Sequence, residues 1–252
     1  MKPGQLPLAM RWPPQQRFAS YRIGENGAGV ALLRRAASEA DATWVFLHGA
    51  PASGKTHLLI AACAAAGAQG RHAQYVSLRA LPQRGVAYSG APDQAANTHH
   101  AGQDHLANAI RALGGSELLA IDDLDAIAGN RTAEHALFDL YNRCKVEKST
   151  LLFAAAQAPA QIGIMLPDLV SRLSSCTQAV LKPLSDEGRR DVLRERGAAR
   201  GIVLDDAALD WLFTRVQRDL GSLTGLLDRL DRESLAAKRR VTVPFLRSLL
   251  DT

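Results

Sequence analysis

The sequence predicts an α/β domain, built on a five-stranded parallel sheet sandwiched by helices, followed by a small all-helical domain. Apolar segments of strand length alternate with helical segments up to residue 184, which is typical of a parallel sheet covered on both faces. From residue 185 onward every segment has a helical pattern, and each opens with Ser, Asp or Thr, the residues favoured at helix N-caps. We therefore expect a domain boundary between residues 184 and 185.

Each predicted strand is a short apolar run that ends at a turn signal. The five strands are predicted at Thr43–Gly49, Ala73–Leu78, Glu117–Asp123, Ser149–Ala156 and Thr177–Leu184. Helices are predicted at Lys55–Gly70, Thr132–Lys148 and Pro167–Leu173, with a shorter helical pattern around Arg34 and Arg35. Residues 83–105 are rich in Gly, Ala, His and Asn without clear periodicity, so they are predicted to form an irregular connection.

Composition excludes several classes of protein. The longest apolar runs, such as Leu151–Ala156, are far shorter than the roughly 20 residues that span a bilayer, so no membrane partner is expected. Cys63, Cys144 and Cys176 are scattered and lack a CxxC partner, which favours buried thiols in a reducing cytoplasm over disulfides or a metal site. The net charge of +5 does not by itself indicate nucleic acid, because most arginines alternate with acidic residues.

The segment "GAPASGKT" matches the phosphate-binding motif G-x-x-x-x-G-K-[ST], and it lies between a predicted strand and a predicted helix, as that motif requires. Its glycines let backbone N–H groups surround phosphates, and the following helix directs its positive end at the same anion. The lysine would reach the β- and γ-phosphates, and the threonine hydroxyl would bind Mg²⁺. We predict contacts to ADP or ATP from Gly49, Ala50, Pro51, Ala52, Ser53, Gly54, Lys55, Thr56 and His57.

A pair of carboxylates supplies the second half of this predicted site. The strand segment "LLAIDD" carries Asp122 to its carboxyl end, beside the loop, where a carboxylate can hold Mg²⁺ through water. Asp123 follows at a position from which it could orient and deprotonate an attacking water. Thr56 and Asp122 are therefore the predicted Mg²⁺ residues, and Asp123 is a predicted catalytic residue.

Longer segments resemble the DnaA-like AAA+ ATPase family. "FLHGAPASGKTHLLIAA", "IDDLD" and "SRL" resemble the initiators themselves. "FDLYNR", "LPDLVSRL", "LKPLSDE" and "LDRLDRESLAAKRRVTVPFLRSLL" are more similar to family members that regulate the initiator. The resemblance runs from about residue 5 to residue 250, is weakest over residues 83–102, and implies an AAA+ domain at 17–184 with a helical lid at 185–252.

The resemblance also assigns roles to single residues. Arg172 in "SRL" matches the family's arginine finger, which reaches the γ-phosphate of a neighbouring subunit. Arg218 matches the sensor-2 arginine of the lid, and Ile23 lies in a segment similar to the one that packs on adenine. Ala154–Ala156 stand where initiators carry a polar sensor-1 residue, so slow hydrolysis is expected, while the intact loop motif predicts firm nucleotide binding.

The segment "QLPLAM" near the N-terminus is apolar, extended and proline-containing. A soluble chain gains little from ordering such a segment unless a partner binds it. It resembles the family's clamp-binding peptide, which implies that residues 1–16 bind the DNA sliding clamp, the β subunit of DNA polymerase III. The predicted clamp contacts are Gln5, Leu6, Leu8 and Met10.

Together these features predict a regulator that binds the clamp and promotes hydrolysis of ATP bound to the DnaA initiator. The helix-turn-helix domain by which initiators read DNA is not expected after the lid, so no sequence-specific DNA-binding domain is predicted. Contact in trans also allows a homo-oligomer. Two alternatives stay open at this point: a non-catalytic adaptor that uses nucleotide only to fix its shape, and a small-molecule P-loop kinase.

Overall fold

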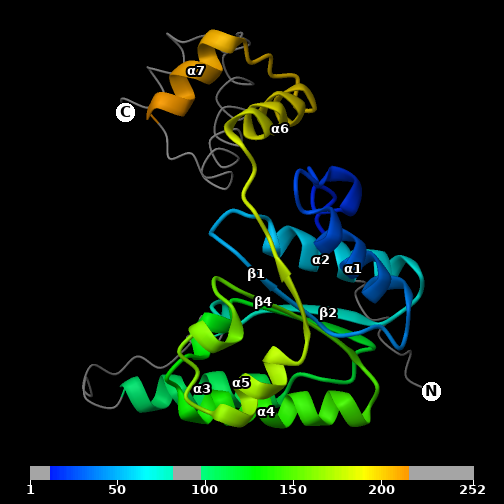
Figure 1. Ribbon diagram of the computed structural model, residues 1–252, viewed down its shortest axis with the longest axis vertical. Coiled ribbons are helices and arrows are strands. Elements are labelled where there is room, and N and C mark those ends of the chain that lie inside the picture. The colour runs from blue at the N-terminus through cyan, green and yellow to red at the C-terminus, as the bar shows by residue number, and fades with distance from the viewer. Residues whose placement is uncertain (1–11, 82–97, 216–252) are drawn as a thin grey trace, which may run out of the picture. The chain divides into compact units, whose positions relative to one another are not determined.

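The computed structural model describes residues 12–81 and 98–215, and the chain divides into two compact units (Figure 1). The first unit holds residues 1–50 and 54–181. The second holds residues 182–252 together with the three loop residues 51–53.

The first unit is built on a five-stranded sheet in the order β2-β3-β4-β1-β5. Its strands are β1 (Val45–His48), β2 (Ala73–Ser77), β3 (Leu118–Asp122), β4 (Thr150–Ala155) and β5 (Thr177–Val180). Every neighbouring pair is parallel, which confirms the predicted sheet. All residues of β3 and β4 are buried, as expected for central strands covered on both faces.

Helices cover the two faces of this sheet in separate layers (Figure 1). On one face, α1 (Gly27–Ser38) and α2 (Lys55–Ala68) pack against one set of strand side chains, which includes Leu47 and Leu152. On the other face, α3 (Thr98–Arg111), α4 (Arg131–Val146) and α5 (Pro167–Ser174) pack against the set that includes Phe46 and Phe153. Short 3₁₀ helices lie at Phe18–Ser20 (η1), Leu124–Ile127 (η3) and Pro159–Gln161 (η4).

The expectation of an irregular connection over residues 83–105 is wrong at its C-terminal end. Helix α3 begins at Thr98, and residues 82–97 lie outside the described part of the chain. The helical pattern lies further along, where Leu106, Ala107 and Ile110 are buried against the sheet and α4. Tertiary packing of this apolar stripe stabilises the helix, although its first turns carry the residues that suggested a loop.

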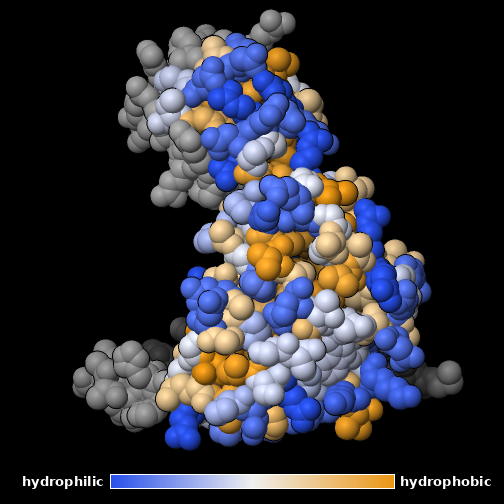
Figure 2. All heavy atoms as spheres, in the orientation of Figure 1, coloured by the Kyte–Doolittle hydropathy of each residue, from blue (hydrophilic) through white to orange (hydrophobic). Residues whose placement is uncertain are grey.

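The described part of the second unit contains α6 (Asp186–Ala198) and α7 (Asp206–Arg215). Ser185 is the N-cap of α6, as predicted, and its hydroxyl accepts a hydrogen bond from the Gly188 N–H at 3.1 Å. Arg190 joins the two helices through an ion pair with Asp210 at 2.6 Å and a position over the Phe213 ring. Figure 2 shows a largely hydrophilic surface over these helices.

The three cysteines are buried and free, as predicted. None of the helices formed by the described residues combines the length and apolar character that crossing a membrane requires.

Candidate nucleotide-binding site

The phosphate-binding loop begins directly after β1 and ends at the first residue of α2. Gly54, the N-cap of α2, has a φ of 91°, a conformation that a residue with a Cβ rarely adopts. A Cβ at Gly49 would lie 2.2 Å from the Leu181 carbonyl oxygen. These two glycines therefore let the loop pass close to its neighbours and turn its backbone into the helix.

The Lys55 ammonium lies back over this loop. Its Nζ donates hydrogen bonds to the carbonyl oxygens of Gly49 at 2.7 Å and Ala50 at 3.0 Å. Burial lowers the pKa of Lys55, and the carboxylates of Asp122, Asp125 and Asp123 oppose that shift. A cation thus stands among the loop carbonyls at the positive end of α2, where an anionic phosphate would be favoured.

The predicted Mg²⁺ residues are in direct contact. The Thr56 hydroxyl donates to Asp122 Oδ2 at 2.6 Å, and the Tyr75 hydroxyl from β2 donates to the same oxygen at 3.0 Å. Burial raises the pKa of the Asp122 carboxyl, while the Thr56 hydrogen bond opposes that shift. A hydroxyl and a carboxylate beside a phosphate-binding loop are hard oxygen donors, so this pair fits Mg²⁺ held jointly by protein and phosphate.

Asp123 has carboxylate contacts of its own, and its backbone N–H donates to Asp122 Oδ1 at 2.9 Å. It adopts a left-handed conformation with φ 58°, its Oδ2 accepts a hydrogen bond from the Ser77 hydroxyl at 2.6 Å, and Arg79 approaches its other oxygen at 3.8 Å. Arg79 also pairs with Asp125 at 3.0 Å, and Asp125 accepts the Ala156 N–H at 2.8 Å. Ala156, the residue after β4, is thus bound to Asp125 through its backbone N–H. The polar sensor-1 side chain that initiators carry is expected in this region.

The segment before α1 lies against the start of α2. The Tyr21 ring packs edge-on to His57 at 5.3 Å between centroids, and it lies so close to Gly54 that a Cβ there would be 2.5 Å from Tyr21 Cε2. His57 Nε2 is 2.9 Å from the Arg17 carbonyl oxygen. Ile23 lies two residues beyond Tyr21 and is 43% exposed, which leaves its side chain accessible to a ligand.

Arg172 lies at the opposite end of the sheet from this loop. It is in the last turn of α5, and its guanidinium stands over the Tyr141 ring at 6.0 Å. Tyr141 in turn packs on Trp44, the residue before β1, at 4.6 Å between centroids. The loop follows the other end of β1, whose four residues span about 13 Å. Within the described residues, no carboxylate or hydrogen-bond acceptor binds the Arg172 guanidinium.

A buried carboxylate fixes the start of α5. Glu134, in the first turn of α4, is fully buried, and its oxygens accept the backbone N–H groups of Met165, Leu166 and Gly129 at 2.9 to 3.1 Å. Hydrogen bonds to a charged acceptor are stronger than neutral ones. Glu134 therefore ties the segment that carries Arg172 to the neighbouring helix.

The structure brings the loop, Thr56, Asp122, Asp123 and the Tyr21 segment together at one end of the sheet. Arg172 is not among them, and Arg218, Gln5, Leu6, Leu8 and Met10 lie outside the described residues. Three polar residues of this site were missed by sequence reasoning: Tyr75, Ser77 and Arg79. Tyr75 and Ser77 belong to β2, which pairs with β3. Because residues two positions apart on a strand face the same side, the sequence of β2 could have indicated that both side chains lie on one face beside Asp122 and Asp123.

Two family models match this chain. A model described as the bacterial DnaA ATPase domain matches residues 15–179, and a model described as the lid domain of Hda matches residues 186–250. The first match alone covers more than half of the 252 residues. The chain belongs to the DnaA-like AAA+ family. Its combination of a DnaA-type ATPase domain with an Hda-type lid places this DnaA-like protein in replication initiation and its regulation.

Solved structures of DnaA share this fold. Domain III of DnaA from Thermotoga maritima is similar with a TM-score of 0.75 at 18% identity, covering 96% of this chain and 98% of that one. AMPPCP-bound DnaA from Aquifex aeolicus gives 0.64 at 19%, covering 87% and 66%. The RuvB branch migration motor of Thermotoga maritima gives 0.62 at 16%, covering 95% and 72%. These similarities confirm the AAA+ architecture of the DnaA-like chain.

Proposed function

We propose that this protein inactivates the DnaA initiator by presenting Arg172 to initiator-bound ATP, while residues 1–16 tether it to the DNA sliding clamp. The observation that carries the proposal is the state of Arg172. Its guanidinium has no carboxylate partner among the described residues, and it lies at the end of the sheet away from the chain's own loop. A cation placed in this way can serve a phosphate only on another molecule, where it would stabilise charge on the transferring phosphoryl group.

The protein's own nucleotide site would act as a switch. The loop N–H groups and Lys55 would bind the phosphates of ADP or ATP, Thr56 would bind Mg²⁺, and Asp122 would hold the ion through water. The ion would neutralise phosphate charge. The Ser77 and Arg79 contacts hold Asp123 away from the role of a base, so we expect turnover by the protein alone below about 1 s⁻¹.

The test combines ATP-loaded initiator, clamp loaded on DNA, and this protein. Wild type should convert initiator-bound ATP to ADP, and Arg172→Ala should lower that rate by about a hundredfold or more, since an arginine finger contributes roughly 10³–10⁵. Arg131→Ala is the matched control, because Arg131 is an exposed arginine on α4 without a partner among the described residues. Equal stimulation by Arg172→Ala and wild type would refute the proposed role.

A second function, an adaptor that uses nucleotide only to fix its shape, is favoured by the hydrogen-bonded state of Asp123 and by the alanines at the end of β4. The nucleotide state and Lys55→Ala distinguish the two functions. An adaptor whose shape is fixed by either nucleotide should bind clamp and initiator equally with ADP and with ATP and should stimulate no hydrolysis, whereas a nucleotide switch should differ between ADP and ATP and should lose initiator stimulation in Lys55→Ala. Pull-downs with ADP and with ATP, run beside the hydrolysis assay, measure both properties.

A further inference from the structure

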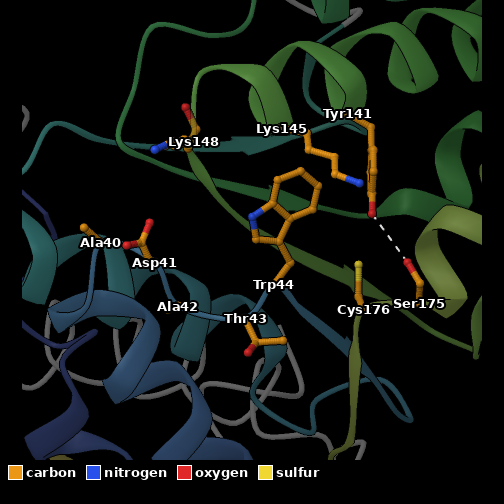
Figure 3. A pocket seen from close by; sticks show the side chains of 11 residues that line it. Ala40, Asp41, Ala42, Thr43, Trp44, Tyr141, Lys145, Lys148, Ser175 and Cys176 are labelled. Atoms are coloured by element: carbon orange, nitrogen blue, oxygen red, sulfur yellow. Dashed lines mark hydrogen bonds between the residues drawn. The ribbon is translucent and has the colours of Figure 1, made fainter.

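A separate pocket opens at the amino ends of the strands, away from the candidate nucleotide site (Figure 3). Its volume is about 390 Å³, which lies within the range of pockets that bind small molecules. The lining residues that matter here are Asp41, Trp44, Tyr141, Lys145, Lys148 and Ser175. All of them belong to the first unit, so the pocket does not depend on the placement of the lid.

The floor of this pocket is aromatic. The Trp44 and Tyr141 rings meet edge to face, with an interplanar angle of 77°. Figure 3 shows the Trp44 indole in the middle of the lining, with Tyr141 and Lys145 on one side and Asp41 on the other. Trp44 is only partly buried, so part of its ring remains available to a flat ligand.

The rim of the pocket carries two cations with no internal partner. Lys145 lies in the last turn of α4 and Lys148 follows the helix, and both side chains are exposed. Among the described residues, neither ammonium has a hydrogen-bond or ion-pair partner, whereas several exposed arginines of the same unit do, Arg35 and Arg79 among them. Asp41 is an anion on the same rim and lies with Lys148 on one side of the Trp44 indole, whereas Lys145 lies on the other side (Figure 3), so repulsion from Asp41 would turn the acidic group of a ligand toward Lys145.

We propose that this pocket binds a small planar aromatic anion, with its ring against Trp44 and its acidic group toward Lys145, while Lys148 adds positive charge on the other side of the ring. The aromatic floor supplies area for a flat ring, and the unpartnered ammonium groups supply the attraction for a carboxylate or sulfonate. A neutral ligand would leave both cations unused, and a cationic ligand would be repelled by them. The pocket is separate from the P-loop, but it shares Tyr141 with Arg172, whose guanidinium stands over that ring.

Isothermal titration calorimetry with 2-naphthoate tests the proposal on the full-length protein, with Mg²⁺–ADP saturating the candidate nucleotide site. We expect saturable binding at one site with a Kd of about 1 mM or tighter, as the size of the probe allows. The double variant Lys145→Gln/Lys148→Gln should weaken binding about three- to tenfold, as the loss of one exposed charge contact and of a second, more distant charge predicts. Asp41→Asn should tighten binding about two- to threefold, because it removes a like charge.

The controls separate this pocket from general surface affinity. Arg131→Gln removes the same charge from the other end of α4 and should leave the affinity unchanged, and the neutral 2-naphthamide should bind at least threefold more weakly than the acid. The Trp44 indole N–H resonance, assigned with Trp44→Phe, should shift on titration. Absence of saturable binding, equal affinity for acid and amide, or equal loss in the Lys and Arg131 variants would overturn the proposal.

Discussion

At the scale of single residues, Asp123 shows how a neighbouring strand can restrain a carboxylate that was predicted to be catalytic. Ser77 on β2 donates a 2.6 Å hydrogen bond to one carboxylate oxygen, and Arg79 approaches the other. A hydrogen bond to a charged group is stronger than one between neutral groups. Breaking the Ser77 hydrogen bond therefore costs free energy before the Asp123 carboxylate can bind a water.

Ser77→Ala should therefore raise the protein's own ATP turnover, by about five- to thirtyfold if one such hydrogen bond of ~1–2 kcal/mol opposes the active position. Single-turnover hydrolysis of bound ATP measures the effect. Ser174→Ala, an exposed serine at the end of α5, is the control. A turnover that stays equal or falls would show that Ser77 does not restrain Asp123.

The cysteines give a prediction that depends on pH. Burial raises the pKa of Cys63 to about 12 and the pKa values of Cys144 and Cys176 to about 11. Because these pKa values are higher in the folded protein, the thiols contribute full stability below the unfolded value of about 9, and that contribution is lost as the pH rises toward 11 to 12.

At pH 8 a thiol with a pKa near 11 is thiolate in only about one molecule in 10³, so thiol-reactive reagents should react slowly with the folded protein. Titration with DTNB should reveal the three thiols only after denaturation. Fast reaction of any cysteine at native pH 8, with unchanged circular dichroism, would contradict the burial that raises these pKa values.

At the scale of elements, α5 depends on a carboxylate that belongs to another helix. Glu134 binds three backbone N–H groups in a fully buried position, and two of them lie directly before α5. An isolated eight-residue helix is marginal in water, so tertiary contacts such as these determine its position.

Glu134→Ala should lower the free energy of unfolding by about 3–5 kcal/mol, since three partly buried backbone N–H groups would lose a fully buried acceptor. Urea denaturation measures the change. Glu147→Ala, an exposed residue at the other end of α4, should change stability by no more than ~0.5 kcal/mol. If the two variants unfold at the same urea concentration, the Glu134 contacts do not stabilise the fold.

The elements of the sheet could be predicted because their signal is local. A buried parallel strand is an apolar run, and the phosphate-binding loop has a fixed sequence between a strand and a helix. The α3 helix could not be placed, because its N-terminal half resembles a loop and its buried stripe takes effect only against α4. Tyr75, Ser77 and Arg79 were missed for a related reason: their partners, Asp122, Asp123 and Asp125, lie 46 or 47 residues away in the sequence.

At the scale of the whole molecule, the proposed activity combines clamp binding by residues 1–16 with the action of Arg172 on initiator-bound ATP. Gln5→Ala/Leu8→Ala should abolish clamp binding and reduce stimulation of the initiator at low protein concentration, because tethering raises the effective concentration at the DNA. Hydrolysis assays over a range of protein concentrations measure this effect.

Excess protein should rescue that double variant, whose Arg172 is intact, and should not rescue Arg172→Ala. If the Gln5→Ala/Leu8→Ala variant stimulated the initiator as well as wild type at every concentration, clamp binding would not contribute to the activity.

The opposite placement of Lys55 and Arg172 along the sheet gives the molecule a direction. If one end binds a nucleotide and the other acts on a nucleotide held elsewhere, contact between two such molecules is head-to-tail. A symmetric pair could not bring both kinds of end together in a single interface. Each contact would therefore join the Arg172 end of one molecule to the nucleotide-binding end of the next. One copy of this protein would then act on one initiator-bound ATP at a time, through a single interface with that initiator.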